Sequence, residues 1–301
     1  MPGNTESLTQ AIGLRLTSVA LFATMNVVIK LAEANGAALG EILFWRQFGA
    51  ALLVASIVGV GPGFGSLRTK KFSAHVLRCV IGLTAMSLTF WTLLLLPLAE
   101  ATTLGFSMPI FATVLGAIVL HEATGWRRWA AVLAGFLGVI IVTQPGSGHI
   151  PLLGIATGLG AAFGTACISI LLRTIGKTEA GLTTVFWFST LSLVPLGFVY
   201  FLAVKAHAPL VWGLLLAIGL LGGVAQIAMT RSLQLGAVSL VVPMDYTALL
   251  WATMFGWVVF GTLPVASTWL GAPVIVASGL YIVWREHRRR RTETDAAISQ
   301  G

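Results

Sequence analysis

The stretch Val238–Phe260, VSLVVPMDYTALLWATMFGWVVF, combines an apolar length with polar and helix-breaking residues. It is long enough to cross a bilayer, which takes about 20 mostly apolar residues. Its first half nevertheless contains Pro243, Asp245 and Tyr246. An acid at the centre of a membrane helix costs about 2.5–3.5 kcal/mol on insertion scales, and a proline bends or locally opens the helix. We therefore expect this span to line a polar cavity inside a membrane protein.

The composition of the whole chain places it in the same class. Hydrophobic residues make up 57% of the 301 residues and charged residues only 9%, whereas soluble domains carry about 25% charged residues. Apolar runs of about 20 residues recur along the chain, so the sequence predicts an all-α, polytopic membrane protein. The net charge of +8 does not indicate nucleic-acid binding, because the basic residues occupy short loops and the C-terminus.

Ten transmembrane helices are predicted, and they leave no room for a separate soluble domain. With the N-terminus in the cytoplasm, most of the 18 Lys and Arg, including Arg15, fall on the cytoplasmic side. The positive-inside rule and the even number of spans therefore predict that both termini are cytoplasmic. The spans are Ala11–Leu31, Glu41–Val60, Val76–Leu96, Ala101–Leu120, Trp129–Thr143, Pro151–Leu172, Leu182–Val204, Leu210–Leu233, Ala237–Phe260 and Trp269–Trp284.

The two halves of the chain are similar to each other. Gly82 of the third span corresponds to Gly219 of the eighth, and further pairs follow in a consistent order. Because each half holds five spans, the two copies must be inverted relative to each other. We expect one five-helix repeat over residues 1–148 and a second over residues 149–301, which ends in a basic cytoplasmic tail. Inverted repeats are common in transporters and place the substrate site near mid-membrane, between the repeats.

Spans four and nine are the strongest candidates for a transport site. Pro109 of span four lies close to the position that corresponds to Pro243, and paired proline-interrupted spans are a sequence signature of such sites. The alternative is that membrane helices simply tolerate these prolines. Asp245 is expected to bind a substrate ammonium group or to take up a proton. Alternatively, it caps a broken helix or hydrogen-bonds to a neighbouring residue.

Polar and aromatic side chains in other spans complete the candidate site. Amides can bind both ends of a zwitterion, and an indole offers an apolar wall and a cation–π face. For each residue the alternative is an ordinary contact between helices. The candidate substrate-binding residues are Asn26, Trp91, Ser107, Gln226, Met229, Asp245, Tyr246 and Trp251, with helix kinks at Pro109 and Pro243.

Two further patterns concern the packing of the helices. Glu41 and Arg46, near the outer end of span two, are expected to form an ion pair or to approach Lys30. Glycines at small-xxx-small spacing are expected to let helices approach closely; these are Gly154/Gly158, Gly160/Gly164 and Gly219/Gly223.

Catalytic, metal-binding and cofactor-binding motifs are incomplete in this sequence. Gly176-Lys177-Thr178 lacks the preceding glycine of a phosphate-binding loop, and His121-Glu122 lacks the second histidine of a zinc helix. We therefore expect a chain that is not an enzyme and that uses no cofactor or metal. Its partners are expected to be a small-molecule substrate and the lipid bilayer, with no nucleic acid, and the chain is expected to act as a monomer.

The residues resemble the drug/metabolite transporter superfamily in its ten-helix, EamA-type branch. The resemblance rests on E-x-x-F-x-R from Glu41 to Arg46, on the run Pro109–Leu120 followed by His121-Glu122, and on the duplicated layout. The run that begins at Pro243 is similar to YddG-type aromatic amino-acid exporters, although Thr262 stands where the family often has glutamate. The resemblance implies a bacterial inner-membrane exporter. Its central cavity would be lined by spans one, three, four, six, eight and nine.

Three functions remain as alternatives at this stage. The first is export of neutral or aromatic amino acids and related small metabolites by alternating access. The second is export of drugs or other metabolites, in which a bulky cation would depend more strongly on Asp245. The third is an intramembrane lipid-modifying enzyme, which would need catalytic His, Asp or Cys clustered at one interface, whereas those residues are scattered in this sequence.

Overall fold

The computed structural model describes residues 5–69, 71–119, 125–144, 150–175, 179–235 and 241–298, and helices form the regular structure in these ranges. The elements are α1 (Thr5–Ala34), α2 (Leu39–Val60), η1 (Phe64–Leu67), α3 (Phe72–Leu95), α4 (Leu98–Gly105), α5 (Met108–Val119), α6 (Trp126–Thr143), α7 (Leu152–Ile175), α8 (Gly181–Ala203), α9 (Pro209–Leu235), η2 (Val242–Thr247), α11 (Ala248–Phe260) and α12 (Ala266–Ile298).

The helices have the length and composition of membrane spans. In the described part of the chain, 9 helical stretches are long and apolar enough to cross a membrane, with α4 and α5 together counted as one. η2 and α11 follow each other directly and complete a tenth crossing. Large apolar side chains such as Leu52, Leu133 and Phe198 are exposed, as expected for a surface that contacts lipid. The prediction of an all-helical, polytopic membrane protein is therefore confirmed.

The fourth and ninth crossings are both interrupted near a proline. α4 and α5 are separated just before Pro109, and Pro243 lies at the start of η2, which is a 3-10 helix. Pro195 and Pro273, by contrast, lie inside the continuous helices α8 and α12. A proline alone therefore does not determine where a helix of this protein breaks.

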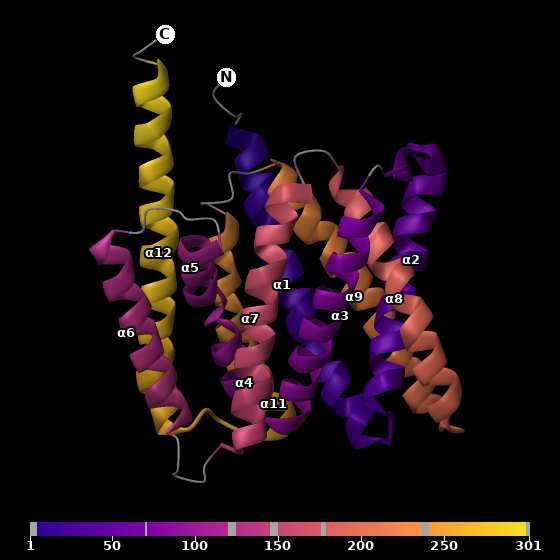
Figure 1. Cartoon of the computed structure of the whole chain (residues 1–301). Helices are drawn as coiled ribbons and strands as arrows, with labels where there is room; N and C mark the ends of the chain where they lie inside the picture. Colours follow the sequence, from indigo (N-terminus) through magenta and orange to yellow (C-terminus); the bar gives the residue numbers. More distant parts are fainter. Residues whose placement is uncertain are drawn as a thin grey trace.

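The helices of the two halves pair with each other across the molecule. α1 packs along α9 and α3 along α7, whereas α2 packs against α8 and α6 against α12. When each helix is replaced by its counterpart in the other half, the pair α1–α9 becomes the pair α7–α3. The same exchange leaves the pairs α2–α8 and α6–α12 unchanged. In Figure 1, α1 begins and α12 ends on the same side of the bundle, and α7, the first helix of the second half, runs opposite to α1. The two repeats are therefore inverted. Their expected boundary, between residues 148 and 149, lies outside the described residues, and the division into two domains stays a prediction.

Glycines bring several of these helices into close contact. α2 and α9 cross where Gly49 faces Gly219, and the backbone of one glycine occupies the space that a side chain on the other would need. On α7, Gly164 faces Ala85 of α3, and a Cβ on Gly164 would lie 2.8 Å from the Ala85 Cβ. The predicted close packing is confirmed for all three small-xxx-small pairs, because each member faces an atom of a neighbouring helix: Gly154, Gly158, Gly160, Gly164, Gly219 and Gly223.

The polar residues of α2 have other partners than the sequence predicted. Glu41 accepts a hydrogen bond from the N–H of Ala38 at 2.8 Å and contacts His207 Nε2 at 2.9 Å. Arg46 donates to Gln226 of α9 at 3.3 Å. The expected Glu41–Arg46 ion pair is therefore wrong. Residues five apart on a helix differ in direction by about 140°, so these two side chains leave α2 on different faces.

Two charged side chains bind the ends of neighbouring helices. Lys30 of α1 donates to the carbonyl oxygens of Leu93 and Leu96 at the end of α3, at 2.6 and 2.8 Å, instead of approaching α2. Glu100 of α4 accepts from a main-chain N–H at 3.1 Å and from the Thr268 hydroxyl at 3.3 Å, both at the start of α12. Both side chains satisfy backbone groups that a helix end leaves without an intrahelical partner.

Candidate functional site

A cavity of about 340 Å³ lies between the two halves of the molecule. Its walls come from α1, α3, α4, α7, α9, η2 and α11. These elements form crossings one, three, four, six, eight and nine, which are the crossings that the family resemblance implied. Both interrupted crossings contribute to the wall. Non-helical backbone at membrane depth is tolerated where it is buried in protein or lines a water-filled cavity.

An ion pair between Arg15 and Asp245 lies at the wall of this cavity. Arg15 Nε donates to Asp245 Oδ1 at 2.6 Å, and Arg15 Nη2 donates to Oδ2, so that the guanidinium binds both carboxylate oxygens. Both residues line the cavity. Paired N–H···O bonds of this kind are among the strongest hydrogen bonds in proteins and fix the orientation of both groups. They also compensate the charge of an acid that would be costly at membrane depth.

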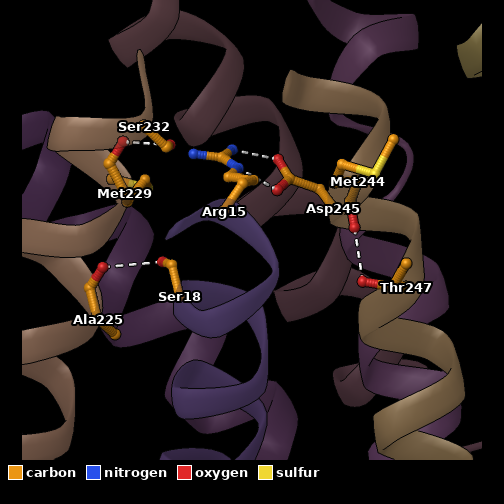
Figure 2. A network of polar contacts seen from close by, with 8 residues as sticks. All are labelled: Arg15, Ser18, Ala225, Met229, Ser232, Met244, Asp245 and Thr247. Atoms are coloured by element: carbon orange, nitrogen blue, oxygen red, sulfur yellow. Dashed lines mark hydrogen bonds and ion pairs between the residues drawn. The ribbon is translucent and has the colours of Figure 1, made fainter. Parts of the chain in front are cut away.

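The local structure explains how the two side chains meet. Asp245 lies in the 3-10 segment η2, where the interrupted helix brings its side chain toward α1, and the Thr247 hydroxyl closes the segment by donating to the Met244 carbonyl at 2.6 Å. α1 is held against α9 by Ser18, whose hydroxyl donates to the Ala225 carbonyl at 2.8 Å. Figure 2 shows Arg15 between these two attachments, with its guanidinium directed toward the Asp245 carboxylate.

The remaining wall is mostly apolar, with isolated polar groups. Phe22 of α1 and Phe106, the residue that follows α4, contribute phenyl rings. The hydroxyls of Thr89, Thr102 and Thr165 also line the cavity, and each donates to a carbonyl four residues earlier in its own helix. Their oxygen atoms can therefore still accept hydrogen bonds. Asn26 differs from them, because its amide forms no hydrogen bond within the described part of the chain.

The structure separates the predicted site residues into three groups. Asn26, Met229 and Asp245 line the cavity. Ser107 and Tyr246 are packed behind its wall: Ser107 is fully buried, and the Tyr246 ring lies edge-on to Phe106, 4.9 Å away between ring centroids. The third group lies away from the cavity: Trp91 is 42% exposed, Gln226 accepts from Arg46, and Trp251 stacks on Phe255 with ring centroids 5.7 Å apart.

Arg15 is the site residue that the sequence reasoning missed. Arg15 lies close to the start of the first span and shares its side with other basic residues, so it counts among the residues that predict the topology. The available signal was its position inside an apolar span, where an ionisable residue usually faces a partner or a cavity. Its partner is 230 positions away in the sequence, which no local pattern indicates.

The His121-Glu122 pair and the Gly176-Lys177-Thr178 motif lie outside the described residues. Among the described residues, no group of three or more His, Cys, Asp or Glu side chains is placed to hold a metal ion.

In the described part of the chain, membrane-spanning helices from both halves surround a cavity that an ion pair borders, which is the arrangement of a membrane transporter. The sequence profile described as the EamA-like transporter family matches residues 9–144. A riboflavin transporter of Rhizobium johnstonii is 31% identical over 279 residues, which cover 90% of this chain and 89% of that protein. This chain therefore belongs to the EamA-like transporter family.

Other relatives match most of the length of the chain. A riboflavin transporter of Vibrio cholerae is 29% identical over 291 residues, covering 94% of this chain and 95% of the relative. An S-adenosylmethionine uptake transporter of Rickettsia prowazekii is 24% identical over 253 residues, covering 82% and 84%. A crystal structure with 19% sequence identity superposes with a TM-score of 0.60 and covers 91% of this chain and 97% of its own, which supports the fold alone. These relatives support small-metabolite transport, and the more specific resemblance to aromatic amino-acid exporters stays a hypothesis.

Proposed function

We propose that this chain is a carrier of the bacterial inner membrane that moves a neutral, ring-containing metabolite through the central cavity by alternating access. Riboflavin is the leading candidate substrate. The observation that carries the proposal is the cavity itself, in which phenyl rings and a free amide surround one carboxylate neutralised by an arginine. The riboflavin transporters among the relatives support this choice of substrate.

The chemistry of riboflavin matches that of the cavity wall. Its flat ring system can pack on Phe22 and Phe106, since aromatic groups stack favourably in offset or edge-on arrangements. The imide edge of the ring has one donor between two acceptors, and the Asn26 amide offers both kinds of partner. The hydroxyls of its side chain can donate to the threonine oxygens and to Asp245. Few polar groups in a largely apolar pocket are typical of small-molecule sites.

Neutral or aromatic amino acids are the second candidate substrate. The adjacency of Arg15 and Asp245 favours them, because a zwitterion presents one charge for each. This binding would require the ion pair to open, at the cost of two charge-assisted hydrogen bonds. A cationic drug is less favoured, because the carboxylate in the described wall already has a cation as its partner.

The orientation in the membrane is also a proposal. The start of α1 and the end of α12 lie on the same side of the bundle (Figure 1). Of the other Lys and Arg, most fall near the cytoplasmic ends of the predicted spans or near the C-terminal end of the sequence. The positive-inside rule places this side in the cytoplasm. Arg15 lines the cavity, but the proposed cytoplasmic side still holds more Lys and Arg than the other side when Arg15 is left out of the count.

Transport assays in proteoliposomes test the substrate and the mechanism together. Purified protein is reconstituted without ATP, and initial uptake of labelled riboflavin, tryptophan and S-adenosylmethionine is measured with and without a pH gradient. Riboflavin should enter protein-containing vesicles several times faster than protein-free vesicles and should be competed by unlabelled riboflavin. Uptake of tryptophan alone would favour the second candidate. Transport of none of the three, with protein shown to be folded, would contradict the proposed substrate classes.

A further inference from the structure

The side chains of Arg15 and Asp245 differ in how much of their surface is accessible. The Asp245 side chain is 39% exposed, whereas that of Arg15 is 7% exposed. Both residues line the cavity, but the carboxylate presents the larger accessible surface and the guanidinium is mostly buried. Figure 2 shows Arg15 between α9, which carries Met229 and Ser232, and the η2 segment that carries Asp245. A ligand in the cavity would meet the carboxylate first.

The guanidinium changes the kind of ligand that this carboxylate can select. Arg15 approaches both oxygens of Asp245 from one side, so the pair carries no net charge. A cation in the cavity is attracted by Asp245 and repelled by Arg15, which lies only one hydrogen bond further away. Each carboxylate oxygen has about two acceptor positions, and Arg15 occupies one on each. The group that remains is a fixed hydrogen-bond acceptor, suited to a hydroxyl or N–H donor of a neutral ligand.

The opposite end of the cavity offers a different group. Asn26 lies eleven residues after Arg15 on α1, which places it on the same face of the helix and about 16 Å further along its axis. Its amide faces the cavity without a partner in the described chain and offers both a donor and an acceptor. Phe22 and Val19 of the same helix form the wall between the two ends. A ligand that uses both ends must be elongated, with a donor–acceptor edge at one end and hydroxyl groups at the other.

We propose that the neutralised Asp245 carboxylate binds the hydroxyl-bearing end of the transported molecule, and that Arg15 is a positioning residue that orients Asp245 and cancels its preference for cations. The inference rests on the proposed function, because it names the substrate class of the same cavity. That class is a planar ring system with an imide-like edge and a polyol chain.

The first test compares two ligands that differ only at the proposed contact. Protein in lipid nanodiscs is titrated with riboflavin and with lumiflavin, which has the same ring system and a methyl group in place of the polyol chain, and dissociation constants are measured by flavin fluorescence. Asp245→Asn should weaken riboflavin binding about tenfold, the range expected for hydrogen bonds to a charged group. It should change lumiflavin binding less than about twofold.

The second test separates the charge of Arg15 from its geometry. Arg15→Met leaves the carboxylate without its cation and should raise affinity for proflavine, a planar cationic dye, about fivefold or more. The double variant Arg15→Met/Asp245→Asn should lose this gain. Arg15→Lys keeps the charge without the two-pronged contact, so it should weaken riboflavin binding without improving proflavine binding. Arg231→Gln, at an exposed position on α9, is the matched control and should leave all three constants unchanged.

The outcomes distinguish this inference from the proposed function. If the wild-type protein binds neither flavin, the proposed substrate is wrong, and the inference fails with it. If the wild type binds riboflavin but Asp245→Asn weakens riboflavin and lumiflavin equally, the inference alone is overturned. Equal proflavine affinity in the wild type and Arg15→Met would also overturn it. Should Arg15→Met fail to fold, Arg15→Lys and Asp245→Asn still decide the question through the two flavins.

Discussion

The crossing of α2 and α9 makes a sharp prediction for the substitution Gly49→Ala. A Cβ atom built on Gly49 would lie 2.5 Å from the carbonyl carbon and 2.6 Å from the carbonyl oxygen of Gly219, and it would overlap the Gly219 Cα as well. All three atoms belong to the backbone, so no side chain can rotate away. Carbon atoms in contact lie about 3.5–4.0 Å apart, which requires the two helices to separate by roughly 1 Å.

The expected cost follows from two opposing effects. Overpacking of a tightly packed contact destabilises a protein by about 1–3 kcal/mol. Replacing a helical glycine by alanine stabilises the helix by about 0.5–1 kcal/mol. The net loss of stability for Gly49→Ala is therefore up to about 2.5 kcal/mol. For a chain of this size the corresponding fall in melting temperature is up to about 8 °C.

Gly59→Ala on the same helix is the matched control. A Cβ atom at Gly59 would meet only the Phe64 ring, at 3.5 Å, which is an ordinary contact. This variant should melt at or slightly above the wild-type temperature. The measurement is thermal unfolding in detergent, followed by tryptophan fluorescence at one fixed heating rate, because such unfolding is often irreversible and depends on that rate. Gly49→Ala melting at the temperature of Gly59→Ala would show that the two helices yield without cost, and the argument from close packing would be wrong.

Three further substitutions test the site and its supports. Asn26→Ala should lower the initial rate of riboflavin uptake about tenfold, while Asn35→Ala, at an exposed position, should leave it unchanged; equal rates for the two variants would remove Asn26 from the binding site. Glu100→Ala leaves two donors at the start of α12 without their acceptor and should destabilise the protein by about 1–3 kcal/mol. The exposed Glu33→Ala should stay within about 0.5 kcal/mol of the wild type, and a melting temperature shared by both variants would contradict the anchoring role. Lys30→Met removes two hydrogen bonds to the end of α3 and should lower the melting temperature by several degrees, whereas an unchanged value would show that these bonds add nothing to stability.

Much of the architecture was predictable because its signals are local. The low share of charged residues and the repeated apolar runs predicted a polytopic helical membrane protein, since only lipid can accommodate that surface. The odd number of spans in each half required inversion of the repeats. Asp245 in an apolar span identified one cavity residue, because such a residue is costly unless it has a function or a partner.

The selection of side chains within each span was less predictable. Asn26 lines the cavity, whereas Trp91, Gln226 and Trp251 lie elsewhere in spans that also border it. A helix of a soluble protein has a polar face that indicates its rotation about the axis. A membrane helix is apolar on both its lipid-facing and its protein-facing sides, so its sequence gives little indication of which residues point inward.

The sequence by itself determined that the chain crosses the membrane repeatedly, that its halves are inverted copies, and that the ninth crossing carries an acid beside a proline, because composition and periodicity act over short distances along the chain. Only the tertiary structure determined that Arg15 neutralises this acid and that Glu41 pairs with His207. Each of these pairs joins residues from opposite halves of the chain. Their meeting depends on how ten helices rotate and pack against one another, and the charge of the cavity follows from that packing.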